Sequence, residues 1–268
     1  MKLIVLVDNN TFIDEYYLGE PAVSYYIEDE DAKILFDTGY SDVFIENAKS
    51  MNIDLNKVNK IAISHGHNDH TGGLKFLSEN IKTKNIEIIA HPNCFDKKYC
   101  EGEYIGTPLL KEALEQDFKL NLCKEPVEIT KNIIFLGEVP SINEFEDRDA
   151  IGVCDSIKGE TNDYVKDDSA IVYKSEKGLF IITGCSHSGI CNIIEYAKKV
   201  CKENKIYGVI GGFHLFDLNQ KLNKTITYFK ENSLKEIYPC HCVSLNAKIE
   251  MGKELNIKEV GVGLKLEI

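Results

Sequence analysis

The sequence predicts an α/β fold in which two β-sheets face each other and helices cover both outer faces. Strand-like runs followed by helical segments occur twice, before about residue 91 and again after about residue 168. The hydrophobic fraction of 43% is enough for a core, and two facing sheets with outer helices would bury the apolar runs of both groups. No linker-like segment divides the groups, so residues 1–268 are expected to form one domain.

The first group begins with three closely spaced runs rich in valine, isoleucine and aromatic residues. These predicted strands are Lys2–Val7, Ala22–Ile27 and Lys33–Phe36. Ser41 can cap a helix over about 42–51. A short apolar strand, Lys60–Ile63, leads into a histidine cluster. A second helix starts at Gly72, and Ile86–Ala90 is a further strand.

Residues from about 92 to 166 are less regular, and they hold four of the six prolines. We interpret this stretch as a long excursion with one inner strand at Ile133–Leu136. Excursions of this length often form lids or the walls of substrate sites. This one is expected to do the same.

The second group begins with two strands, Ser169–Tyr173 and Leu179–Thr183, joined by a tight turn. The segments that follow alternate between helical and strand-like spacing. They are a helix at Ile190–Val200, a strand at Ile206–Ile210, a helix at about 221–231, a strand at Glu236–Tyr238 and an edge strand at Val262–Ile268.

Composition narrows the possible partners and the location. The net charge of -12 repels phosphate backbones, so nucleic acid is not expected as a partner, whereas a small-molecule substrate is. The nine cysteines form no CxxC pair, which favours free thiols in a reducing cytoplasm. The first apolar run is too short for a secretory signal, and no stretch of about 20 apolar residues exists to span a membrane.

The histidine cluster carries the strongest functional signal. His65 and His67 stand two apart at the end of a strand, so both imidazoles point the same way and can hold one metal ion. Gly66 removes a side chain between them, and Asp69 and His70 follow on the next turn, where they can hold a second ion. Two ions about 3.5–4 Å apart would share a water molecule and lower its pKa. Four potential ligands in six positions disfavour an ordinary polar loop.

The pattern His65-x-His67-x-Asp69-His70 resembles the HxHxDH signature of the metallo-β-lactamase superfamily. That resemblance implies an αββα sandwich of two mixed sheets, with the metals at one edge. Further matching segments are LFDTG at 35–39, ISHGHNDHTGGL at 63–74, GEVP at 137–140, TGCSHSGI at 183–190 and GGFHL at 211–215. Together they resemble one branch, labelled 7,8-dihydropterin-6-yl-methyl-4-(β-D-ribofuranosyl)aminobenzene 5'-phosphate synthase, a name tied to methanopterin biosynthesis.

The resemblance also implies further ligands. His241 resembles the late ligand to the second metal. Cys185 stands where the superfamily often has a bridging aspartate, and it is either a thiolate ligand or a small buried cysteine. The segment before the late hairpin lacks the usual third histidine of the first metal. Either Asp168 substitutes for it, or His187 reaches across, and His187 is favoured.

Two histidines outside the cluster are candidates for substrate contact. His91 precedes a proline, so its backbone is expected to be extended and its ring can face a cleft. His214 follows two glycines, where the backbone can approach a ligand closely. A purely structural role is the alternative for both residues.

The resemblance implies a metal-dependent hydrolase with two divalent ions, zinc first and iron or manganese as alternatives. The substrate would be small, with or without a phosphate group. Asp69 would orient a metal-bound hydroxide, and His187 or His214 would pass a proton to the leaving group.

Three other functions remain open. The branch label implies a synthase, a transferase that joins a pterin diphosphate to an aminobenzene ribotide. A di-iron redox protein is a further alternative, although such members of the superfamily carry an acid where His67 stands and an attached flavin domain. The last alternative is a metal-binding sensor without catalysis.

Overall fold

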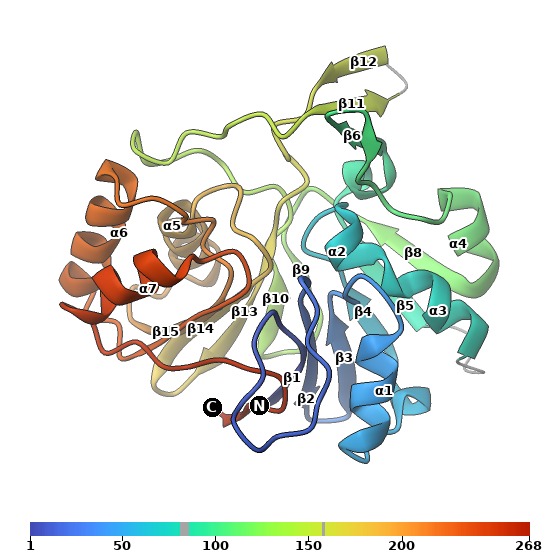
Figure 1. Cartoon of the computed structure of the whole chain (residues 1–268), viewed down its shortest axis with the longest axis horizontal. Helices are drawn as coiled ribbons and strands as arrows, with labels where there is room; N and C mark the ends of the chain where they lie inside the picture. The colour runs from blue at the N-terminus through green and yellow to red at the C-terminus, as the bar shows by residue number, and fades with distance from the viewer. Residues whose placement is uncertain (81–85, 157–158) are drawn as a thin grey trace.

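The computed structural model describes residues 1–80, 86–156 and 159–268. Two β-sheets pack face to face, and helices lie on both outer sides (Figure 1). The predicted fold class is therefore confirmed. Residues 157–158 of the predicted excursion lie outside the described residues.

The first sheet has seven strands in the order β17-β1-β2-β3-β4-β5-β8. In chain order these are β1 (Lys2–Val7), β2 (Ser24–Asp29), β3 (Ala32–Phe36), β4 (Lys60–Ala62), β5 (Ile86–Ala90), β8 (Phe118–Leu122) and β17 (Lys265–Glu267). Strands β3, β4, β5 and β8 run parallel, and the others pair antiparallel. The edge strand predicted at Val262–Ile268 is present as β17, at the end of the sheet beside β1, but it is shorter than expected.

The second sheet has six strands in the order β16-β15-β14-β13-β10-β9. In chain order these are β9 (Val127–Glu128), β10 (Ile133–Phe135), β13 (Ala170–Ser175), β14 (Gly178–Thr183), β15 (Ile206–Gly211) and β16 (Glu236–Pro239). Strands β14, β15 and β16 are parallel. Each sheet therefore has a parallel part whose strand ends share one edge.

Helices divide between the two outer faces (Figure 1). Those beside the first sheet are α1 (Val43–Ser50), α3 (Gly73–Asn80) and α4 (Lys111–Asp117), and those beside the second are α5 (Ile190–Cys201), α6 (Gln220–Glu231) and α7 (Leu245–Gly252). The N-cap of α1 is Asp42 and not Ser41 as predicted, although the Ser41 hydroxyl, one residue earlier, accepts a hydrogen bond from the Val43 amide at 3.2 Å. Within the described ranges, no helix is both long enough and apolar enough to cross a membrane.

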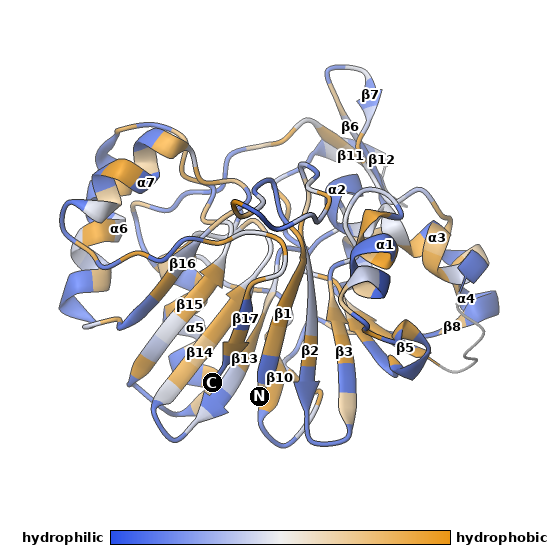
Figure 2. Cartoon of the chain, turned by 60° about the horizontal axis from the view of Figure 1, so that its bottom comes forward, coloured by the Kyte–Doolittle hydropathy of each residue, from blue (hydrophilic) through white to orange (hydrophobic). Residues whose placement is uncertain are grey.

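The central strands are apolar along most of their length because both of their faces are buried (Figure 2). Along β1, Leu3 and Val5 face the core between the sheets, whereas Ile4 and Leu6 pack towards the helices. Both faces of the strand are thus buried, which removes the polar positions that would otherwise alternate with apolar ones.

The excursion from about 92 to 166 is more ordered than the sequence predicted. It supplies an edge strand to each main sheet, β8 and β9, and a separate four-stranded sheet. The strands of this accessory sheet are β6 (Lys97–Cys100), β7 (Glu103–Tyr104), β11 (Val153–Ser156) and β12 (Gly159–Asn162). These strands have two to four residues each and carry many charged or polar side chains, so no apolar periodicity marks them.

We expect Phe36→Ala to lower the free energy of unfolding by about 3–5 kcal/mol, because a large ring is removed from a tightly packed core. Phe36 is fully buried between the sheets and stacks on Tyr25 with ring centroids 6.3 Å apart. Urea unfolding of the metal-free protein measures the change. Tyr16→Ala is the control, since that side chain is 93% exposed. Equal stability of the two variants would contradict this account of the core.

Candidate metal centre

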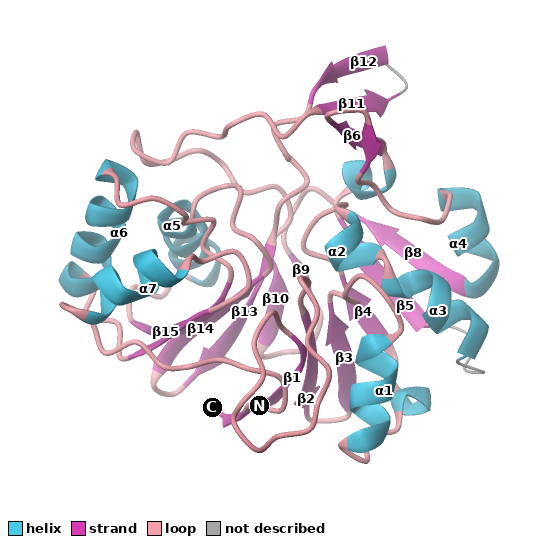
Figure 3. Ribbon diagram, in the orientation of Figure 1, coloured by secondary structure: helices cyan, strands magenta, loops and turns pink. Residues whose placement is uncertain are grey.

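The candidate site lies at the edge where the parallel strands of both sheets end. Asp37 follows β3, and the cluster from Ser64 to His70 follows β4 and includes the short helix α2 (Asn68–Thr71). Cys185, His187, His214 and His241 follow strands β14, β15 and β16. Figure 3 shows these strand ends passing into loops on one side of the molecule. The fold therefore gathers residues that lie up to about 200 positions apart in the sequence.

A first group of donors contains His65, His67 and His187. His65 Nε2 and His67 Nδ1 face each other at 3.0 Å. The ring of His187 lies 4.8 Å from that of His65 and 5.2 Å from that of His67, between centroids. Its Nε2 is buried and has no hydrogen-bond partner in the part of the chain that the structure describes. A buried nitrogen without a partner costs stability unless a ligand binds there.

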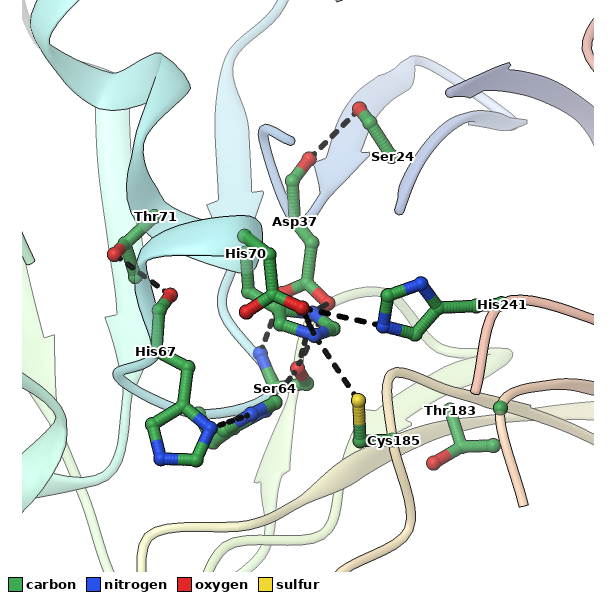
Figure 4. Close-up of polar contacts among 12 residues, drawn as sticks. Ser24, Asp37, Ser64, His67, His70, Thr71, Thr183, Cys185 and His241 are labelled. Atoms are coloured by element: carbon green, nitrogen blue, oxygen red, sulfur yellow. Dashed lines mark hydrogen bonds and ion pairs between the residues drawn. The ribbon is translucent and has the colours of Figure 1, made fainter. Parts of the chain in front are cut away.

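A second group contains Asp69, His70, Cys185 and His241, and Figure 4 shows His70, Cys185 and His241 pointing toward one another. His70 Nε2 lies 3.2 Å from the Cys185 sulfur and 3.4 Å from Asp69 Oδ2. His241 Nε2 lies 3.3 Å from the same Asp69 oxygen. One carboxylate, one thiol and two imidazoles therefore converge on a small volume.

Cys185 belongs to the second group and also lies close to two members of the first, as Asp69 does to His65 and His67. Its sulfur lies within 4.8 Å of the donor atoms of Asp69, His70 and His241, and also of His65 and His187. The thiol thus stands between two clusters of ligands. This is the position that a bridging ligand would take in a two-metal centre.

Most of the histidines use one ring nitrogen for an outer contact and turn the other into the site. His65 Nδ1 contacts the Ser64 hydroxyl at 3.0 Å, and His241 Nδ1 contacts Asn9 Oδ1 at 3.0 Å. His70 Nδ1 contacts Asp37 Oδ2 at 2.7 Å. Metal-binding histidines typically have such outer partners, which fix the ring and its tautomer. The donor set therefore fits divalent ions such as zinc.

Asp37 braces the whole cluster. One carboxylate oxygen accepts the Ser64 amide at 2.7 Å, and the other accepts the Ser64 hydroxyl at 2.7 Å and contacts His70 (Figure 4). Asp37 lies within the motif LFDTG, but the motif by itself predicted no role for it. Its position directly after a buried strand was the available signal.

The electrostatics favour metal binding. Burial lowers the pKa of His65 well below its usual value, and burial together with the nearby Lys98 lowers that of His67 to about 4. Both rings are therefore neutral at pH 7, the form that binds a metal. Burial alone would raise the pKa of Asp69, but His70 and His241 hold it well below its usual value. Asp69 is therefore an anionic donor.

Four non-glycine residues at this site have a left-handed backbone. Asp37, Ser186, His214 and His241 all have positive φ, at 59°, 56°, 50° and 50°. Non-glycine residues rarely adopt this conformation, and it is found preferentially at functional sites. Gly184 allows the two sheets to approach, since a Cβ there would lie 2.2 Å from the Ser64 hydroxyl oxygen.

Three predicted residues lie outside the two donor groups. Asp168 is buried, and its carboxylate accepts the Ser188 amide at 2.8 Å, so it supports the loop that carries His187. His91 is fully buried and contacts Glu138 at 3.2 Å. His214 stacks near His187 with centroids 4.4 Å apart, and its Nδ1 is buried with no hydrogen bond to any described residue.

A polar pocket of about 690 Å³ adjoins the candidate centre. All its lining residues lie between Asn93 and Asp167, so the excursion alone forms it. One of them, Asp163, places a carboxylate oxygen 3.9 Å from His67 Nε2. The lysines of the lining are Lys98, Lys124 and Lys166.

Comparisons with known proteins identify the relatives of this chain and its fold. The model of the metallo-β-lactamase superfamily matches residues 18–95. The chain is 34% identical, over 92% of its length and 89% of the relative's, to 7,8-dihydropterin-6-methyl-4-(β-D-ribofuranosyl)-aminobenzene-5'-phosphate synthase of Methanocaldococcus jannaschii. It is 36% identical to an uncharacterized protein of the same archaeon, over 97% of each chain. A solved structure described as a metal-dependent hydrolase of the β-lactamase superfamily has a TM-score of 0.86 and 30% identity, and the match covers 100% of this chain and 99% of that one.

We expect Asp37→Asn to weaken zinc binding by about 10–100-fold, the usual effect of losing a partner behind a ligand. The amide can still accept from Ser64, and asparagine tolerates the positive φ. Its NH₂ group, however, cannot accept the Nδ1 proton of His70. Competition with a chromogenic chelator measures the affinity. Ser24→Ala is the control, because Ser24 bonds only the backbone carbonyl of Asp37. Wild-type affinity in Asp37→Asn would show that the brace is dispensable.

Proposed function

Because this chain belongs to the metallo-β-lactamase superfamily, in the branch of the archaeal synthase, we propose that it is an enzyme that displaces a phosphorylated leaving group from a small substrate at a two-metal centre. The observation that carries the proposal is the overlap of the donor groups, since Cys185 and Asp69 each lie within 4.8 Å of ligands from both. Two divalent ions, zinc first with iron or manganese as alternatives, would supply Lewis-acid activation of the substrate and its leaving group there.

The chain's own residues would handle the nucleophile and its proton. Asp69 is an anionic donor that faces both His70 and His241, so it can orient an incoming nucleophile. His187 is part of the first donor group, which leaves His214 to carry protons. The buried Nδ1 of His214 has no hydrogen bond to a described residue and is close to the centre, so it can accept the proton that the nucleophile loses.

The similarity to the archaeal synthase supports a condensation more strongly than the hydrolysis that the sequence analysis placed first. In this reaction the aromatic amine of an aminobenzene ribotide attacks the methylene carbon of a pterin diphosphate. A C–N bond forms, the C–O bond breaks, the amine loses a proton and diphosphate leaves.

Hydrolysis is the second candidate, and the description of the solved relative as a metal-dependent hydrolase favours it. Water would then take the place of the amine at the same centre. The other two alternatives, a di-iron redox protein and a sensor, have no comparable support.

The pocket beside the centre is the proposed place for a polar, uncharged part of the substrate, because its lining carries the carboxylates of Asp96, Glu138, Asp163 and Asp167, which would repel a phosphate. Most of its lining residues are polar or charged, so it offers many hydrogen-bonding groups to a ligand. Lys166 is exposed on its rim, and Lys124 is held by Glu138 at 2.7 Å. The earlier interpretation of the excursion as a substrate wall thus becomes part of this proposal, as does a cytoplasmic location.

We expect the wild-type protein to bind two zinc ions, and His187→Ala to bind one fewer. Asp168→Asn should keep both, because burial raises the pKa of Asp168 and a neutral amide can replace a buried carboxyl that only supports a loop. Elemental analysis after gel filtration measures the content. Loss of a metal from Asp168→Asn but not from His187→Ala would reverse the assignment of the third ligand.

We expect release of diphosphate from a pterin diphosphate to depend on added aminobenzene ribotide, with one condensed product formed for each diphosphate. Chromatography and a coupled diphosphate assay follow both products. Equal release without the ribotide would favour hydrolysis instead. Asp69→Ala should lower either rate by about 100-fold or more, because it removes the group that orients the nucleophile. Full turnover in that variant, with full metal content, would exclude the proposed role of Asp69.

A further inference from the structure

A buried lysine links the accessory sheet to the candidate metal centre. Lys98 on β6 is 1% exposed, and its ammonium group lies 2.9 Å from Asp163 Oδ2 and 3.0 Å from Asp167 Oδ1. Both carboxylates are themselves buried. A charge this deep in a protein persists only when it is paired, and removing one partner leaves the others uncompensated.

Asp167 carries this link to the backbone of the metal-binding segment. Its second oxygen, Oδ2, accepts the Gly66 amide at 2.8 Å. Gly66 stands between His65 and His67, whose facing nitrogens are 3.0 Å apart. The direction of the Gly66 amide therefore sets how the two imidazoles are presented.

Gly66 is also held from its other side. A Cβ at this position would lie 1.9 Å from the carbonyl oxygen of Cys94 and 3.0 Å from the Lys98 side chain. The segment is thus wedged between the short 3₁₀ helix at Pro92–Phe95 and Lys98. Little room exists for it to shift unless Lys98 and its partners move.

Asp163 faces the outer nitrogen of His67. The Nε2 atom of His67 is buried without a hydrogen bond to any described residue, and the nearest carboxylate oxygen recorded for it is Asp163 Oδ2 at 3.9 Å. The same oxygen is the one that Lys98 binds. Lys98 therefore controls where this carboxylate sits relative to His67.

We propose that Lys98 is a positioning residue of the metal centre, which holds Asp167 on the Gly66 amide and Asp163 behind His67. The inference rests on the proposed two-metal function, but no motif or family signature noted in the sequence includes Lys98, Asp163 or Asp167. It makes the accessory sheet a structural part of the centre as well as a wall of the pocket.

The test compares Lys98→Met and a matched pair at position 167. We expect Lys98→Met and Asp167→Ala each to weaken zinc binding by about 10–100-fold. Both should also speed exchange of the Gly66 amide proton in the metal-free protein, measured by NMR, because the acceptor is lost or displaced. Asp167→Asn keeps an oxygen for Gly66 but loses the charge that pairs with Lys98, so its zinc affinity should fall clearly less than that of Asp167→Ala.

Lys60→Met is the control, since Lys60 lies on the strand before the cluster and pairs with Glu87 at 2.6 Å away from the centre. It should change neither readout. Wild-type zinc affinity in Asp167→Ala would overturn the proposal, and so would an equal loss in Asp167→Asn and Asp167→Ala. If Lys98→Met does not fold, the pair at position 167 still decides. Failure of the wild-type protein to bind zinc would instead count against the proposed function, while amide exchange would still test the link to Gly66.

Discussion

The carboxylate of Asp37 is the contact on which the candidate centre depends. It lies directly after β3 and binds the amide and hydroxyl of Ser64, directly before His65, so it joins the ends of two neighbouring parallel strands. The same carboxylate orients His70, whose other nitrogen meets Cys185 from the opposite sheet. One anion thus ties together the two halves of the sandwich at the edge where the ligands collect. Its burial is tolerated because three donors surround it.

The acidity of the protein is consistent with this arrangement. A net charge of -12 would repel a phosphorylated substrate if it were spread evenly. At the centre, however, burial keeps the pKa values of His65, His67 and His187 below their usual values, so these three imidazoles are neutral donors. Cations bound to such a set keep most of their charge and so reverse the potential locally. The region that meets the substrate can therefore differ in sign from the rest of the surface.

The sequence predicted the fold and the core of the site where signals were local. Buried strands appeared as apolar runs, and His65, His67, Asp69 and His70 are close enough in the chain for strand geometry to place them together. His187 was favoured over Asp168 as the third ligand of the first metal only because that metal lacked a third imidazole. In the structure, the ring of His187 lies beside that of His65. Lys98 and its two carboxylates could not be found in this way. Lys98 precedes Asp163 by 65 positions and Asp167 by 69. The accessory strands near these residues have no periodic apolar pattern that could have predicted the contact.

The left-handed backbone at Asp37, Ser186, His214 and His241 has an evolutionary consequence. Glycine would adopt this conformation at a lower cost in free energy, although aspartate and histidine, like asparagine, adopt it more often than most residues. Selection for higher stability would favour replacement at these positions. Each replacement of a histidine there would remove an imidazole from the candidate metal centre. Selection for thermal stability and selection for turnover therefore favour different residues at these four positions. In homologues that no longer need the activity, we expect substitutions to accumulate first at these four positions.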